Sequence, residues 1–170
     1  MPTYTISWEI AGEVQLSRTL TRLAIDLHDF RVPLKQVGKE VVYPEIRNQF
    51  GKEGDPGHWP RLSPGYARWK ARHHIGAPML VASGALRASL TFAGAPGAIY
   101  DLTKEQLTIG TSLQTPGGKW NLGLIHQQGA PRAHIPARPM LKRRVAAQGR
   151  AVTIFSDWFA EMGRKAEVSP

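Results

Sequence analysis

Residues 99–111 of the chain read IYDLTKEQLTIGT and contain two short runs of residue types that favour strands. The first run covers 99–102 and the second covers 106–111, with the polar residues Thr103, Lys104 and Glu105 between them. Runs of Ile, Tyr, Leu and Thr bounded by polar residues are typical of strands. The stretch therefore predicts two strands of a small antiparallel sheet.

Two further segments show the alternation of apolar and polar residues that a half-buried strand requires. Tyr4, Ile6, Trp8 and Ile10 alternate with polar residues, and residues 89–92 alternate again as Ser-Leu-Thr-Phe. A period of two places successive side chains on opposite faces of a strand. We expect the chain to open with a strand and residues 89–92 to form another.

The remaining apolar residues follow helical spacing. Intervals of three and four predict an amphipathic helix from Val14 to Asp29, whose apolar stripe is Leu16, Leu20, Leu23, Leu27 and Phe30. Pro33 suits the first turn of a second helix that reaches Phe50. Pro44 should kink that helix or end it early, because proline has no amide hydrogen and clashes with the preceding turn.

Shorter helices are expected at 64–72 and at 120–128, where Gly129 ends the second, and a last amphipathic helix at 145–162. Together these elements predict an α+β fold in which a small antiparallel sheet packs against amphipathic helices, with long loops rich in glycine and proline. We expect one domain over residues 1–163 and a flexible C-terminal tail over 164–170.

The segment from Gly51 to Pro78 is the longest of these loops. Its glycines and prolines exclude long regular elements, although large side chains recur along it at Trp59, Leu62, Tyr66 and Trp69. Long loops in compact domains are uncommon and are usually functional or ordered by a partner. The loop is therefore predicted to pack and to serve assembly.

Composition fits a folded protein. The chain has 170 residues, of which 42% are hydrophobic and 21% charged, and it has no cysteine, which excludes disulfides and thiolate metal sites. The first residues show no basic segment followed by an apolar run, and no apolar stretch approaches the roughly 20 residues that span a bilayer. We expect a protein of the cytoplasm without membrane contact.

The net charge of +9 is concentrated in the second half of the chain. A basic segment without acidic residues contains Arg132, Arg138, Lys142, Arg143, Arg144 and Arg150. Such a segment attracts polyanions or acidic protein surfaces, although a solvated basic face is the simpler interpretation.

No set of residues predicts catalysis, a metal site or a cofactor. The histidines at 73, 74, 126 and 134 lack the i, i+4 pairing and nearby carboxylate of a zinc hydrolase. Ser83 lacks the preceding glycine of a nucleophile elbow and is better explained as a helix cap. No phosphate-binding loop is present, so an enzyme is not expected.

Aromatic and basic residues are mixed along the long loop, which is also the composition of a surface for single-stranded nucleic acid. The simpler interpretation is that the rings pin the loop to the core. Trp59, Tyr66 and Trp69 are the rings concerned.

Five blocks of sequence, in order, resemble the phage virion morphogenesis family of Mu-like phages. They are Phe50, Glu53 and Gly54 with Trp59, Leu62, Tyr66 and Lys70; residues 80–89, which include the turn Ser83, Gly84 and Leu86; residues 109–111; residues 126–129; and residues 136–141. The resemblance covers about residues 14–141.

The resemblance implies a small α+β structural protein of tail completion and head–tail joining. It implies a ring of subunits, hexameric or matched in number to a connector, that meets neck, connector and tail-tube proteins in the host cytoplasm and in the virion, with passing DNA as a nonspecific contact. The candidate interaction surface is Trp59, Leu62, Tyr66, Lys70, His126, Gly129, Pro136, Arg138, Pro139 and Leu141. Arg138, between two prolines, would lie on a stiff arm suited to docking. The alternative is a basic nucleic-acid-binding module.

Overall fold

The computed structural model describes residues 28–142 and 145–168. The strand expected at residues 4–10, nearly all of the helix expected at 14–29, and Arg143 and Arg144 of the basic segment lie outside the described residues. The α+β fold class predicted from the sequence is confirmed.

The sheet is a single hairpin among the described residues. Strand β1 (Ala98–Leu102) pairs antiparallel with strand β2 (Leu107–Thr111), so that Ala98 lies opposite Thr111. The polar residues between the strands close the turn, since the Gln106 amide donates to the Thr103 hydroxyl at 3.0 Å. The prediction from residues 99–111 is therefore confirmed.

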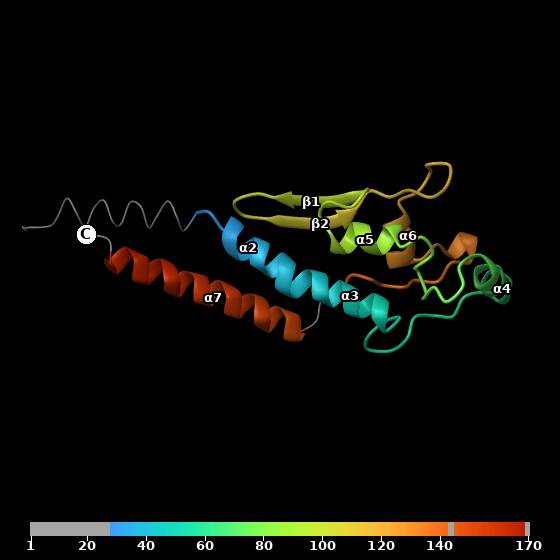
Figure 1. Ribbon diagram of the computed structural model, residues 1–170, viewed down its shortest axis with the longest axis horizontal. Coiled ribbons are helices and arrows are strands. Elements are labelled where there is room, and N and C mark those ends of the chain that lie inside the picture. Colours follow the sequence, from blue (N-terminus) through green and yellow to red (C-terminus); the bar gives the residue numbers. More distant parts are fainter. Residues whose placement is uncertain (1–27, 143–144, 169–170) are drawn as a thin grey trace, which may run out of the picture.

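A long helical rod passes beneath the hairpin (Figure 1). Helix α2 (Arg31–Val37) continues through a π-helical turn (Gly38–Val42) into helix α3 (Tyr43–Gly51). Pro44 does not end the helix, because the turn before it is widened: the Tyr43 amide reaches back five residues to the Gly38 carbonyl.

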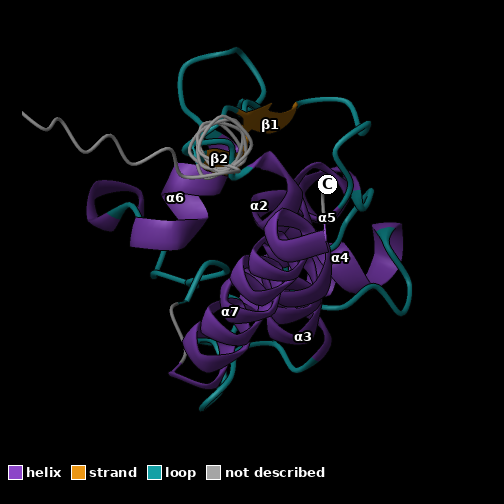
Figure 2. Ribbon diagram, turned by 90° about the vertical axis from the view of Figure 1, so that its left-hand side faces the viewer, coloured by secondary structure: helices purple, strands orange, loops and turns teal. Residues whose placement is uncertain are grey.

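Helix α7 (Val145–Val168) lies antiparallel to the rod, on the side of α2 away from the hairpin (Figures 1 and 2). An aromatic cluster joins the two: the ring of Phe30 lies 6.0 Å from Phe155, 5.7 Å from Trp158 and 6.2 Å from Phe159. The helix extends to Val168, beyond the end near Gly163 that the sequence pattern indicates.

The core lies between α3, helix α5 (Ala85–Thr91) and the loops that follow them. Its buried residues are Ile46, Phe50, Trp59, Val81, Leu86, Leu90 and Met140. The strand predicted at 89–92 is wrong, because α5 continues through Thr91. Leu86 and Leu90, one helical turn apart, are both buried, and four alternating residues are too few to separate a strand from a helix.

Three shorter elements complete the described chain: helix α4 (Pro64–His73), helix α6 (Leu122–Gln128) and a 3-10 turn (Pro131–Ala133). The Asn121 side chain caps α6 by accepting from the Leu124 amide at 2.8 Å, and Gly129 follows the last turn. None of the described helices combines the length and apolar character that crossing a bilayer requires.

Candidate interaction site

Helix α4 stands at one end of the molecule and begins as the sequence predicts (Figure 1). Pro64 occupies the first turn, where its missing amide hydrogen costs nothing, and Lys70, Arg72 and His73 fill the last turn. Positive charge at a helix C-terminus is favourable because the carbonyl ends carry partial negative charge. The helix therefore presents a basic end.

Lys70 ties α4 to the loop behind it. Its side chain is 6% exposed, and its ammonium donates to the Pro78 carbonyl. Burial lowers the pKa of Lys70, and the Glu53 carboxylate opposes part of that shift. The sequence predicts Lys70 as a surface contact, but its burial makes it an internal anchor instead.

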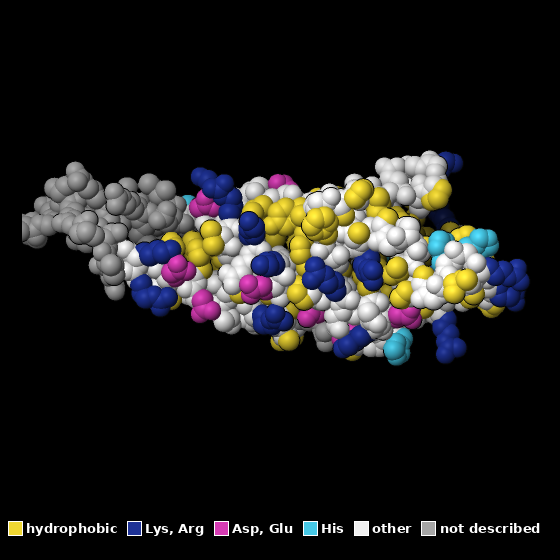
Figure 3. Space-filling view, in the orientation of Figure 1, with side chains coloured by type: hydrophobic (Ala, Val, Ile, Leu, Met, Phe, Trp, Pro, Cys, Tyr) yellow, Lys and Arg dark blue, Asp and Glu magenta, His cyan; other side chains and the backbone are white. Residues whose placement is uncertain are grey.

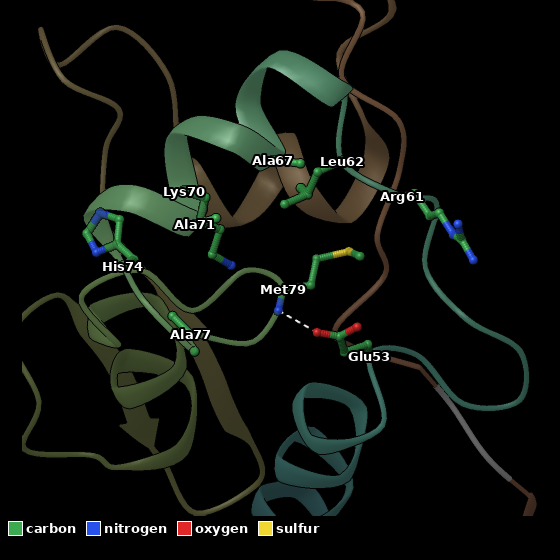
Figure 4. A pocket seen from close by; sticks show the side chains of 10 residues that line it. Glu53, Arg61, Leu62, Ala67, Lys70, Ala71, His74, Ala77 and Met79 are labelled. Atoms are coloured by element: carbon green, nitrogen blue, oxygen red, sulfur yellow. Dashed lines mark hydrogen bonds between the residues drawn. The ribbon is translucent and has the colours of Figure 1, made fainter.

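A hollow lies under α4, and Glu53 lines it on the side opposite Lys70 (Figure 4). Its carboxylate accepts from the Met79 amide at 2.6 Å, and its own backbone has a positive φ of 51°. The hollow has a volume of about 430 Å³ and is open to solvent, and Leu62, Lys70 and Met79 are among the residues that line it. No cluster of three or more residues able to hold a metal occurs among the described residues.

The two candidate segments of the sequence meet through Trp59 and Arg138. The indole of Trp59 is 4% exposed, packs edge-on against Phe50 and donates to the Pro139 carbonyl at 3.1 Å. Arg138 is also 4% exposed and donates to the carbonyls of Pro60 at 2.9 Å and Arg61 at 3.1 Å. The long loop and the proline arm therefore form one unit.

This burial corrects the expectation that Arg138 lies on an arm free to dock. Prolines at 136 and 139 do keep the arm extended, but the guanidinium between them points into the molecule and satisfies two loop carbonyls. Trp59 is likewise a core residue, so for this ring the simpler interpretation is confirmed. The half-buried Leu62 and the more exposed Tyr66, Pro136 and Leu141 retain surface.

Gln127 fixes the arm, although the sequence patterns do not single it out. Its side-chain oxygen accepts from the amides of Met140 at 2.9 Å and Leu141 at 3.0 Å, and its amide group donates to the Leu141 carbonyl at 2.9 Å. Met140 is thereby held in the core, 1% exposed. Gln127 lies between His126 and Gly129 in one of the five blocks that resemble the family. That position is the sequence signal from which a role for Gln127 could have been predicted.

His126 and Gly129 act within the molecule as well. The His126 carbonyl accepts from the Arg138 amide at 2.6 Å. Burial and then the nearby Arg138 charge lower the pKa of the His126 imidazole, whose buried Nδ1 has no hydrogen-bond partner among the described residues. Gly129 has a φ of +78°, and a Cβ there would lie 2.8 Å from the Ala137 amide nitrogen.

The segment 83–86 is structural. Gly84, with a φ of +82°, occupies the N-cap of α5, and the Ser83 hydroxyl accepts from the Ala85 amide at 3.3 Å. Leu86 follows into the core. The N-cap is therefore Gly84 and not Ser83 as expected, although the Ser83 hydroxyl still takes one free amide of the first turn.

A stacked ridge of three rings runs along the outer side of α4. We call it the aromatic ridge: Tyr66, Trp69 and His73, with Tyr66 47% and Trp69 44% exposed. Tyr66 and Trp69 stack at 5.4 Å, and Trp69 and His73 at 4.8 Å. The His73 Nδ1 lies 2.8 Å from the Trp69 carbonyl oxygen, which holds the ridge in one arrangement.

The family assignment follows from comparison with known proteins. Residues 13–154 match the sequence model of the phage virion morphogenesis family. The chain belongs to this family. No curated protein and no solved structure matches the chain. The family makes the chain a protein of phage particle assembly.

The blocks that carry the family resemblance contact one another in space. Trp59 reaches Pro139, and the His126 carbonyl accepts from the Arg138 amide. The Ser89 hydroxyl in the second block donates to the Thr111 hydroxyl in the third at 2.8 Å. In this family member the blocks therefore build one packed unit that displays the aromatic ridge.

Among the described residues, the predicted basic segment does not form one surface. Arg138 is buried, and Arg150 donates to the Glu40 carbonyl at 2.7 Å from α7. Arg132 is exposed on the 3-10 turn, and Lys142 is half-buried. Instead, Arg68 and Arg72 of α4 and Arg61 of the loop before it are exposed, and Lys, Arg and His side chains gather at that end of the molecule (Figure 3).

Proposed function

We propose that the chain is a structural, non-enzymatic part of the neck or tail end of a tailed phage. In this role it completes the tail and joins it to the head as one subunit of a ring. Support comes from the family and from a rigid exposed surface that has no role in the fold. That surface is the aromatic ridge, whereas Leu141 lies apart from it, against the helical rod and the start of α7.

The aromatic ridge is the observation that carries the proposal. Tyr, Trp and Arg are enriched among the residues that dominate protein interfaces. Tyr and Trp in particular bury large rigid surfaces with few rotamers to restrict. The rings are already ordered by stacking, so docking costs little further side-chain entropy. Arg61, Arg68 and Arg72 favour an acidic surface on the neighbouring neck or tail protein.

The aromatic ridge is less suited to stacking against the bases of a nucleic acid. The rings of Tyr66 and His73 lie on either side of Trp69 and stack against it, so the indole offers its edge to a ligand. A platform for single-stranded nucleic acid needs free ring faces. We therefore keep a nucleic-acid-binding module as the second candidate, supported by the exposed arginines alone.

The test is a phage that lacks this gene and is complemented from a plasmid. Without the protein we expect filled heads and tails that stay separate in electron micrographs, and joined particles when it is supplied. Particles that join normally without it would contradict the proposal. Mass measurements of the protein mixed with isolated tails or connectors test whether it assembles into a ring of several subunits.

The ridge is tested by Tyr66→Ser combined with Trp69→Ser. Loss of two contact residues at about 2 kcal/mol each corresponds to roughly a thousandfold loss of affinity for the neighbouring part. Phe92→Ser is the matched control, since Phe92 is 64% exposed but lies away from α4 at the end of α5. If the natural protein, the ridge variant and the Phe92→Ser control joined heads to tails equally well, the ridge would not be part of the interface.

A further inference from the structure

Helix α7 has a second apolar stripe that the described chain leaves largely exposed, with Phe30 covering part of Phe159 at one end. Its buried side, with Ile154 and Trp158, packs on the helical rod. A different side carries Val145, Val152 and Phe159, seven residues apart, which are 85%, 65% and 45% exposed. Polar residues such as Asp157 occupy a third side. We call Val145, Gly149, Val152, Ser156, Phe159 and Gly163 the α7 stripe.

The small residues of the α7 stripe suit a second helix lying against it. Gly149 and Gly163 are inside a helix, where each glycine costs about 1 kcal/mol relative to alanine. A Cβ at either position would meet nothing within 4 Å. These glycines therefore relieve no crowding within the described chain, whereas small residues do let a partner helix approach closely.

The segment best placed to cover the stripe is the one that precedes His28. Phe30, only two residues later, is held by Phe155, Trp158 and Phe159. Any chain that leaves this cluster toward the N-terminus starts at the edge of the α7 stripe. The sequence there has its own apolar series, Leu16, Leu20, Leu23 and Leu27, with the same alternation of four and three.

The length and the spacing of the two series also agree. Because α2 and α7 are antiparallel, a segment that turns back at residues 28–30 would run parallel to α7 (Figure 1). Two antiparallel helices are commonly joined by a loop of two to five residues. Leu20 and Leu27 are seven residues apart, as are Val152 and Phe159. In the parallel arrangement Leu20 would therefore lie beside Val152, and Leu27 beside Phe159.

We infer that residues 14–27 dock as a helix on the α7 stripe of their own chain and form a three-helix layer with α2 and α7. A short connection gives the segment a local concentration in the millimolar range, which favours its own stripe over that of a second copy. The layer would bury three exposed apolar side chains of α7 and the leucine series together.

The absence of cysteine from the chain allows a direct test by disulfide formation. The full-length variant Leu20→Cys/Val152→Cys should form an intrachain bond under mild oxidation, visible as faster non-reducing migration at monomer mass. Leu20→Cys/Asp157→Cys is the control, since Asp157 is exposed on another side of α7. We expect at least about tenfold more intrachain bond in the first variant, equivalent to about 1.4 kcal/mol.

Two outcomes would overturn the inference. Disulfide-linked dimers as the main product would show that a second copy covers the stripe. Equal bond formation in both variants would show that residues 14–27 do not dock there. Hydrogen exchange checks the result without cysteines: Val152→Ser should reduce the protection of residues 16–27 by about tenfold, whereas Thr153→Ser should leave it unchanged.

Discussion

At the scale of single residues, buried polar side chains hold the α4 end of the molecule together. Arg138 is 4% exposed and satisfies the carbonyls of Pro60 and Arg61. Arg138→Met keeps the apolar stem but leaves both carbonyls unpaired, so we expect a loss of about 2–4 kcal/mol in the free energy of unfolding. Arg132→Met, at an exposed position, should change it by less than about 0.5 kcal/mol. Urea unfolding followed by tryptophan fluorescence measures both, and equal effects would contradict the anchoring role.

Gly129 is a second residue on which the arm depends. Its positive φ and the backbone of residues 135–137 leave no room for a side chain, because a Cβ would lie 2.9 Å from the Ile135 carbonyl oxygen. We expect Gly129→Ala to destabilise the fold by more than about 2 kcal/mol, since the neighbouring atoms are backbone and cannot move aside cheaply. Gly51→Ala is the control, because a Cβ at Gly51 would meet nothing within 4 Å and the φ there is not positive. A thermal melt that ranks the two variants in the opposite order would refute this account.

His126 makes the same region sensitive to pH. Its pKa in the fold is lowered, mainly by burial, so the unfolded chain binds the proton first as the pH falls. Stability from the neutral imidazole is therefore complete above about pH 6.5 and is lost as the pH falls through the lower folded value. We expect His126→Gln to reduce the difference in unfolding free energy between about pH 7.5 and about pH 5.5, and His134→Gln, at an exposed position, to leave it unchanged. An unchanged difference in His126→Gln would exclude His126 as its source.

Which of these residues the sequence could reveal depends on their chemistry. Trp59 is predictable as an anchor, because a large ring in a loop is usually buried. Arg138 and Lys70 are not, because charged side chains are nearly always exposed unless a specific partner is present. Their partners are backbone carbonyls 78 and 8 residues away, respectively, and carbonyls have no sequence signature.

At the scale of elements, the local sequence is sufficient to predict a helix or strand where that element does not depend on distant contacts. The hairpin and α4 follow from residue types and from Pro64 at a first turn. The strand expected at 89–92 fails because tertiary packing of Leu86 and Leu90 selects the helix. Pro44 is accommodated by the π turn before it, which no local pattern predicts.

Pro44 and Arg150 together join the helical rod to α7. Proline cannot donate to the carbonyl four residues before it, which is that of Glu40, and Arg150 donates to this carbonyl at 2.7 Å. We expect Arg150→Ala to cost about 1 kcal/mol in the natural sequence and less in a Pro44→Ala background, where an amide is present at position 44. A double-mutant cycle should give a coupling energy of about 0.5 kcal/mol or more. Additive effects would show that the two residues act independently.

At the scale of the whole molecule, the fold distributes the net charge of +9 differently from the linear sequence. The described residues of the predicted basic segment are divided between a buried arginine, a helix contact and an exposed turn, while Arg61, Arg68 and Arg72 are exposed on α4 and on the loop before it. Residues far apart in sequence meet only after folding, so a charge count along the chain could indicate a polyanion contact but could not locate it.

Whether the α4 end binds DNA can be tested by comparing two variants with the same net charge. Each exposed cation that neutralises a DNA phosphate contributes about 0.9 to the slope of log affinity against log salt concentration. We expect Arg61→Gln/Arg68→Gln/Arg72→Gln to weaken binding to double-stranded DNA and to reduce this slope by about 2 to 3. Lys35→Gln/Lys39→Gln/Lys104→Gln removes three exposed charges away from α4 and should have a much smaller effect, since those lysines lie on α2, on the following π turn and between the strands. Fluorescence anisotropy over a range of salt concentrations measures both slopes. Equal reductions would mean that DNA responds to net charge alone, and the α4 end would then be left with protein contacts only.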